Sequence, residues 1–123
     1  TGAIAAEAVK AAQILTEDNI SVAVYTLSTI KPLDADVIKK LAKQFKLLVS
    51  IEEHNIIGGL GSAIAEVKAG ISGTHAPLLC LGMKDQYSSI VGSHEFLRDY
   101  YGLSAEKLAS RICDRLEAIV CKQ

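Results

Sequence analysis

The residues with the clearest potential for chemistry lie in one stretch, Ser50–Glu66, which reads SIEEHNIIGGLGSAIAE. Glu52 and Glu53 could move protons, because adjacent carboxylates can have shifted pKa values. His54 follows them directly, and histidine is a common residue in acid–base chemistry. A helical pattern comes after three glycines: Gly58, Gly59 and Gly61. Because a strand, glycines and a helix N-terminus can together hold a phosphate, the stretch is a candidate for cofactor binding as well as for acid–base chemistry.

The spacing of the glycines fits neither common phosphate-binding motif. A dinucleotide fingerprint that began at Gly59 would need glycine or alanine where Ile64 stands. A P-loop needs G-K-[ST] before its helix, but Gly61 is followed by Ser62-Ala63. The neighbouring pair of acids would also repel a phosphate held nearby. We therefore expect Gly58 and Gly59 to form a tight turn with positive φ, and Gly61 to let a helix pack closely on a sheet.

The acids and the histidine are equally compatible with structural roles. Consecutive residues of an extended chain point to opposite sides, so Glu52 and Glu53 would not face one common proton. We expect one of them to pair with a lysine or a backbone N–H at a strand end. His54 could take part in acid–base chemistry or make a polar contact between domains. The histidines show no metal-ligand spacing, so the sequence predicts no metal site. No motif supports a Ser-His-Asp or Cys-His arrangement either, so it predicts no catalytic residue.

Apolar runs and helical patterns alternate along the chain and must position this stretch. Strands are predicted for Val22–Leu27, Leu47–Ile51 and Leu78–Leu81, with a helix over Ala3–Leu15 ahead of them. Three further helices are predicted after residues whose side chains can accept a hydrogen bond from a helix N-terminus: Asp34, Ser93 and Ser104. Another helix is predicted after the glycines that end at Gly61. Pro32, just before Asp34, cannot continue a strand ladder.

This alternation predicts an α/β fold with a parallel sheet and helices on both faces, formed as a single domain over residues 1–123. A sheet of three strands is small for this architecture. The opening Thr1-Gly2 also looks like a turn after a strand that the sequence does not contain. We therefore expect the chain to be a fragment of a longer one.

The composition excludes several classes of protein. Hydrophobic residues make up 50% and charged residues 22% of the chain, which is typical of a globular domain. Thirteen basic and 14 acidic residues nearly cancel, so we expect no nucleic-acid partner and no binding to an anionic membrane. No apolar run approaches the ~20 residues of a membrane span, and no signal peptide pattern opens the sequence. A cytoplasmic location is expected.

Three motifs in this order give the chain a family resemblance: TIKPLD (Thr29–Asp34), EEHNIIGGLGSAIAE (Glu52–Glu66) and GSHEFLRDYYGL (Gly92–Leu103). With this spacing the sequence resembles the C-terminal domain of transketolase, and it is most similar to the small subunit of the split bacterial and archaeal-type enzymes. The resemblance extends from Thr1 to the final helix. It implies a three-layer α/β/α sandwich with a mixed, mostly parallel sheet.

The resemblance also implies a function for the parent enzyme, which would move two-carbon ketol units between sugar phosphates in the pentose phosphate pathway. Thiamine diphosphate and a divalent metal, Mg²⁺, would lie between other domains, across a homodimer interface. None of the cofactor-binding segments is present here, so this fragment alone is expected to bind no cofactor and to be inactive. Its role would be domain packing and dimer assembly with the remaining domains or subunit, with Glu53 and His54 as contacts.

Two alternatives remain open at this point. 1-Deoxyxylulose-5-phosphate synthase and the beta subunit of 2-oxoacid dehydrogenases share this domain, and in the latter it helps to dock a partner acyltransferase. The second alternative is a regulatory domain that binds a nucleotide or a sugar phosphate at Gly58–Gly61. The order of strand, glycines and helix is what favours it.

Overall fold

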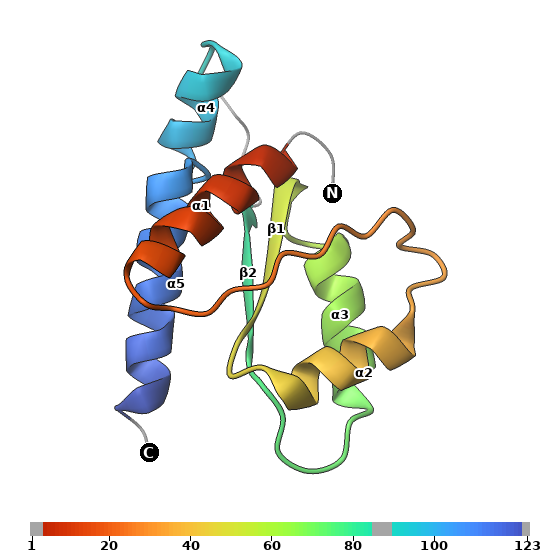
Figure 1. Ribbon diagram of the computed structural model, residues 1–123. Coiled ribbons are helices and arrows are strands. Elements are labelled where there is room, and N and C mark those ends of the chain that lie inside the picture. Colours follow the sequence, from red (N-terminus) through yellow and green to blue (C-terminus); the bar gives the residue numbers. More distant parts are fainter. Residues whose placement is uncertain (1–3, 85–89, 122–123) are drawn as a thin grey trace.

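Figure 1 shows the computed structural model, which describes residues 4–84 and 90–121. Helices and strands alternate along the described chain, as the sequence predicts. The first helix, predicted for Ala3–Leu15, runs on to Glu17. In chain order the elements are α1 (Ala5–Glu17), α2 (Ala35–Gln44), β1 (Leu48–Asn55), α3 (Leu60–Ala69), β2 (Leu78–Met83), α4 (His94–Tyr100) and α5 (Ala105–Val120).

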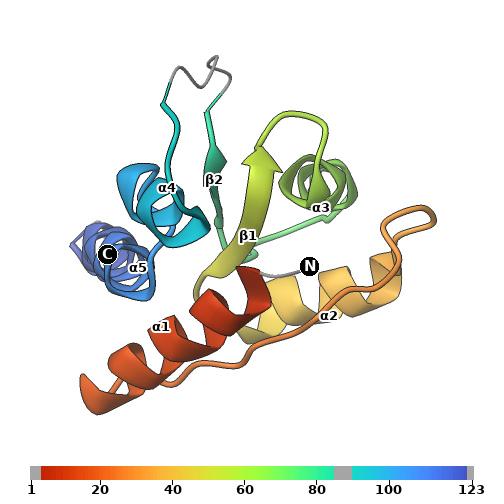
Figure 2. The same ribbon diagram turned by 90° about the horizontal axis from the view of Figure 1, so that it is seen from above.

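The two strands are parallel, with Leu48 opposite Leu78, and they form the middle layer of the fold. Helices α1 and α5 cover one face of this layer, and α2 and α3 cover the other, as the view from above shows (Figure 2). Val49 and Ile51 of β1 pack towards the first pair of helices, whereas Leu48 packs towards the second. The three-layer α/β/α arrangement is therefore confirmed.

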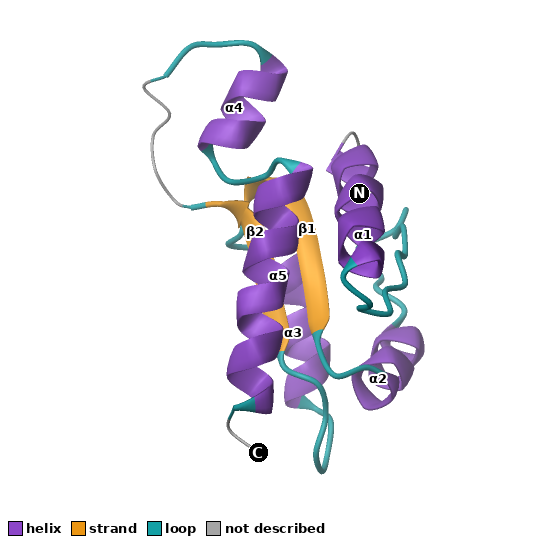
Figure 3. Ribbon diagram, turned by 60° about the vertical axis from the view of Figure 1, so that its left-hand side comes forward, coloured by secondary structure: helices purple, strands orange, loops and turns teal. Residues whose placement is uncertain are grey.

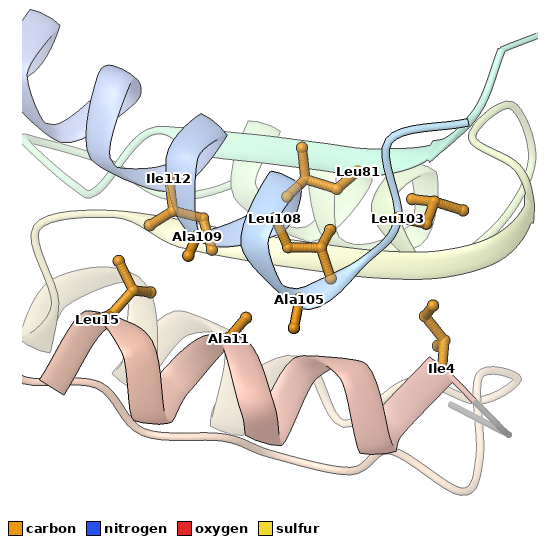
Figure 4. Close-up of a cluster of buried hydrophobic side chains, with 9 residues drawn as sticks. All are labelled: Ile4, Ala11, Leu15, Leu81, Leu103, Ala105, Leu108, Ala109 and Ile112. Atoms are coloured by element: carbon orange, nitrogen blue, oxygen red, sulfur yellow. The ribbon is translucent and has the colours of Figure 1, made fainter. Parts of the chain in front are cut away.

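The larger core lies between the sheet and the α1–α5 layer (Figure 4). Leu81 of β2 and Leu108 of α5 are each 0% exposed there. Alanines on both helices face each other at this contact, and their small side chains let the two helices approach closely. The buried residues of this cluster are Ile4, Ala11, Leu15, Leu81, Leu103, Ala105, Leu108, Ala109 and Ile112.

Two of the three predicted N-terminal caps are confirmed. Asp34 accepts a hydrogen bond from the Val37 N–H at 3.1 Å, and Ser93 accepts one from the Phe96 N–H at 3.2 Å. Ser104 precedes α5 as predicted, but its side chain does not cap the helix.

The N-terminus of α5 is capped from another helix. The Ser104 hydroxyl donates to Asp99, and the N–H of Ala105 donates at 3.1 Å to the carboxylate of Glu7, which lies on α1. The tertiary packing of α1 on α5 brings this carboxylate into place, so a sequence pattern confined to the start of α5 could not reveal it.

The prediction of a strand over Val22–Leu27 is wrong, because this segment forms no ladder in the structure. Its apolar side chains stay partly exposed, with Val24 at 44% and Tyr25 at 56%. A strand exists only through hydrogen bonds to a neighbouring strand, and here none lies beside the segment. The sheet of the described residues therefore has two strands rather than three, and it is parallel rather than mixed.

β1 is longer than predicted and continues through Glu52, Glu53 and His54 to Asn55. The paired acids therefore belong to the strand and not to the loop after it. None of the helices in the described residues is long and apolar enough to cross a membrane.

Candidate functional site

Glu52 is buried at the start of α3. Its side chain is 1% exposed, and each of its carboxylate oxygens accepts a hydrogen bond at 2.7 Å, one from the Leu60 N–H and one from the Gly61 N–H. The first N–H groups of a helix have no partner within the helix, and the helix dipole favours a negative charge beside them. Glu52 therefore supplies the N-terminal cap that no residue of α3 provides.

The glycines of this loop have three different roles. Gly58 has φ +76°, which confirms the predicted tight turn. Gly59 precedes α3 with φ −91°, so the predicted positive φ is wrong there; instead, a Cβ at Gly59 would overlap the Glu52 carboxylate. A Cβ at Gly61 would lie 2.6 Å from the Cys80 Sγ, so the predicted close packing of helix on sheet is confirmed.

The loop between β1 and α3 uses its own N–H groups internally. Five of them donate within the described chain: Ile56 to Met83 O, Ile57 to Asn55 Oδ1, Gly58 to Ser62 Oγ, and Leu60 and Gly61 to Glu52. A phosphate cradle needs such groups free to point at the ligand. A phosphate at this position would have to displace a buried carboxylate of the same sign.

Glu53 points to the other side of β1, as expected for consecutive strand residues. Its Oε1 accepts hydrogen bonds from Arg98 of α4, at 2.7 Å from Nε and 2.6 Å from Nη2. His94 Nδ1 lies 3.7 Å from the same oxygen. The expectation that one acid would pair with a lysine or a backbone N–H is met by Glu52, whereas the partner of Glu53 is an arginine. This ion pair joins α4 to the sheet.

The sequence analysis did not single out Arg98 or His94. They stand four residues apart in the motif HEFLRDYY, a spacing that places them on one face of a helix and could have indicated a shared partner. The acid at the end of β1 lies about 45 residues earlier, and only the fold brings it close.

His54 does not join the two acids into an acid–base pair. Its side chain is 59% exposed, and Nδ1 lies 3.1 Å from its neighbour's carbonyl (Asn55 O) and 3.7 Å from Glu52 Oε2. Pro32 and Asp34 belong to the segment that leads into α2, where Asp34 caps the helix. Within residues 4–84 and 90–121, no group of three His, Cys, Asp or Glu side chains could hold a metal ion.

Exposed apolar side chains lie at the carboxyl end of the strands. Phe96 and Tyr100 on α4 are 51% and 55% exposed, and their rings stack with centroids 6.2 Å apart. Ile57, in the loop before α3, is 68% exposed. Figure 3 shows α4 at the end of the molecule to which the strands point. We call His54, Ile57, His94, Phe96 and Tyr100 the carboxyl-end surface.

Residues 1–108 match the protein family described as “Transketolase, C-terminal domain”. The chain belongs to the transketolase C-terminal domain family. The match takes in every part of the site: the acids of β1, the glycine loop, and Arg98 on α4. The fold and the family resemblance stated from the sequence are thereby confirmed.

Other family members are similar over most of this chain. A Methanocaldococcus jannaschii protein named as a transketolase C-terminal section is 42% identical over 117 residues, which is 95% of this chain and 35% of that protein. A 1-deoxy-D-xylulose-5-phosphate synthase of Heliobacterium modesticaldum is 38% identical, over 88% of this chain and 16% of the enzyme.

A solved structure described as “Split gene transketolase, inactive beta4 tetramer” has the same fold. It matches with a TM-score of 0.79 and 30% identity, over 92% of this chain and 35% of that one. The chain thus spans about a third of the length of this structure and of the Methanocaldococcus relative.

Proposed function

We propose that this transketolase C-terminal domain does no chemistry itself and serves domain packing and dimer assembly in a longer enzyme. That enzyme would transfer two-carbon ketol units between sugar phosphates. Thiamine diphosphate, when bound between the other domains, would supply the carbanion chemistry of that transfer. The observation that carries the proposal is the use of Glu52 as an internal cap, because the position where a phosphate could bind is taken by the protein's own carboxylate.

The loop between β1 and α3 does not fit thiamine diphosphate. A diphosphate needs free N–H donors, whereas the N–H groups of Gly58, Leu60 and Gly61 are already hydrogen-bonded, two of them to the Glu52 carboxylate. No cluster in the described parts of the chain offers three ligands to Mg²⁺. Binding of the cofactor and its metal elsewhere in the longer enzyme is part of the proposal, and so is the cytoplasmic location.

The carboxyl-end surface is the part of the domain that we assign to contacts with the other domains or with a second subunit. It combines exposed aromatic and aliphatic side chains with two histidines. Three of its residues, His94, Phe96 and Tyr100, lie on α4, which has no buried residue of its own. Exposed apolar residues gathered at one end are typical of an interface. A homodimer of the longer enzyme is the assembly we propose.

Isothermal titration calorimetry tests the absence of cofactor binding. The 123-residue chain mixed with thiamine diphosphate and Mg²⁺ should release no binding heat, whereas the longer polypeptide should bind both. Tight, stoichiometric binding by the 123-residue chain would contradict the proposal. A raised melting temperature with a nucleotide or a sugar phosphate, lost on Gly59→Val, would instead support the regulatory alternative.

The second candidate is the C-terminal domain of a 1-deoxy-D-xylulose-5-phosphate synthase, and the 38% identical Heliobacterium relative favours it. The domain would have the same packing role in that enzyme. Product analysis of the longer polypeptide separates the two: ketol transfer between two sugar phosphates supports the first proposal. Formation of 1-deoxy-D-xylulose 5-phosphate supports the second.

A further inference from the structure

β2 has a free edge on the side away from β1. Within residues 4–84 and 90–121 the sheet consists of these two strands, so no strand pairs with β2 on that side. The Leu48 N–H donates to Pro77 O at 2.9 Å, so the backbone groups of Pro77 face β1. Since alternate residues of a strand turn these groups to opposite edges, those of Leu78 and Cys80 face outwards. An edge with unpaired N–H and C=O groups is a template for another strand.

An open cavity of about 320 Å³ lies beside this edge. It is lined by Leu79 of β2 and by Arg111, Asp114, Arg115 and Ala118, which stand three and four positions apart on one face of α5. None of the lining residues belongs to β1 or α1, so the cavity opens on the outer side of β2. Figure 2 shows α5 beside β2, on the side away from α3. Because Leu79 is the second residue of β2, the cavity is separate from the carboxyl-end surface.

The two arginines of the cavity are half-buried and unpaired. Neither Arg111 nor Arg115 makes a hydrogen bond or an ion pair in the part of the chain that the structure describes. Asp114, which stands between them in the sequence, is exposed and pairs with neither. A guanidinium offers its N–H donors in a planar fork that matches a carboxylate. Two such groups, partly removed from water, favour an acidic side chain of a partner.

A second copy of this chain does not supply that acidic side chain through its own β2. The strand Leu78–Met83 reads LLCLGM and has no acidic residue. Pairing of two copies about a twofold axis would also bring the same arginines of both copies towards one another, and like charges repel. An extended segment with acidic side chains provides both the backbone groups that the edge needs and the carboxylates that the arginines need.

We propose that the free edge of β2 binds an extended, acidic segment of another protein by strand addition. The backbone of the segment pairs with Leu78 and Cys80. Leu79 packs towards α5, so the residue of the segment that lies level with it points to the same face. That residue is an aspartate or a glutamate, and its carboxylate meets Arg111 and Arg115. This binding goes beyond the proposed function and does not depend on the reaction of the longer enzyme.

Fluorescence anisotropy with the full-length polypeptide tests the binding. The probe is a fluorescein-labelled peptide of about seven residues, the length of a typical strand, in which glutamate alternates with valine. We expect saturable binding that is at least about tenfold weaker when glutamine replaces glutamate in the peptide, because hydrogen bonds to a charged group are then lost. The double variant Arg111→Gln/Arg115→Gln should weaken binding by about the same factor. No saturable binding up to about 1 mM peptide, or undiminished binding by the variant, would overturn the proposal.

A second double variant separates strand addition from general attraction between charges. Lys40→Gln/Lys43→Gln removes the same number of positive charges from exposed positions of α2, on the other face of the sheet. At physiological salt such distant charges are screened, so we expect the affinity to change by less than about twofold. Equal losses of affinity for the two double variants would refute the proposed site.

Amide hydrogen exchange, measured by NMR on the same polypeptide, reports on the edge itself. Without peptide, we expect the amides of Leu78 and Cys80 to exchange with solvent faster than that of Leu79, which faces β1. A saturating amount of the glutamate–valine peptide should slow the exchange at Leu78 and Cys80 by at least about tenfold. Slow exchange at both residues without peptide would mean that the edge is already paired and would contradict the proposal. Bound peptide that leaves both amides in fast exchange would contradict it as well.

Discussion

Replacing the buried acid by its amide, Glu52→Gln, tests the central feature of the site. The variant keeps the shape of the side chain but has one acceptor oxygen where Glu52 has two. One of the two N–H groups at the start of α3 would then face an amide NH₂, which cannot accept its hydrogen bond. The negative charge next to the helix N-terminus would also be lost.

The magnitude follows from the two hydrogen bonds of 2.7 Å. A hydrogen bond to a charged group contributes about 1.5–3 kcal/mol, and a neutral one contributes about 1 kcal/mol. Leaving a buried N–H without an acceptor costs about 1–3 kcal/mol. We therefore expect Glu52→Gln to lower the free energy of unfolding by about 2–4 kcal/mol, since one bond is weakened and the other is lost.

Glu53→Gln is the matched control, because it makes the same chemical change one residue along and on the other side of β1. The Glu53 side chain is 29% exposed, so water can replace part of its ion pair, and we expect a loss of about 1 kcal/mol or less. Urea unfolding followed by circular dichroism measures both losses. A loss for Glu52→Gln below about 1 kcal/mol, or no larger than the control, would refute the assignment of Glu52 as the cap of α3.

Three other predictions concern contacts around the site and the core. Gly61→Ala should destabilise the fold by about 1–3 kcal/mol in thermal melts, because its Cβ would lie 2.6 Å from the Cys80 Sγ. Adding Cys80→Ala should recover part of this loss, and an unchanged loss would contradict the packing explanation. Glu7→Gln should cost about 1 kcal/mol at pH 7. The hydrogen bond from Lys10, together with a backbone N–H of α5, lowers the pKa of the Glu7 carboxyl below its ordinary 4.5. The stabilisation by the Glu7 carboxylate is therefore complete above pH 4.5 and disappears as the pH falls through the lowered pKa of the folded state. A difference in stability between the unchanged chain and Glu7→Gln that persists at about pH 2 would contradict this explanation. Arg98→Ala should speed amide hydrogen exchange of α4 by roughly fivefold through loss of an ion pair of about 1 kcal/mol, with α5 unchanged; equal exchange in α4 would contradict its anchoring role.

Much of the fold could be predicted because local chemistry determines it. Helical spacing of apolar residues predicted four of the helices in the described residues, and the capping residue Ser93 predicted the other, α4. The short polar side chains of Asp34 and Ser93 predicted two of the caps. Gly61 was predicted to allow close packing, and the structure places the Cys80 sulfur and the Ser50 oxygen against it. In each case the sequence neighbours of a residue, or its missing Cβ, already contain the physical cause.

The failures share a different cause. Val22–Leu27 has the composition of a buried strand but forms none, since a strand needs a partner along its edge. The role predicted for Gly59 was also wrong. This position requires glycine because a Cβ would overlap the Glu52 carboxylate, and not because its φ angle is positive.

By itself, the sequence determined the family, the alternation of strands and helices, and the failure of the glycines to match a phosphate motif, because these depend on residue types and short spacings. Only the tertiary structure decided what the charged groups do. Glu52 caps α3, Glu53 binds Arg98, and Glu7 caps α5 across 98 residues of chain. The partner of a charge is set by which elements pack together, and that information is spread over the whole fold.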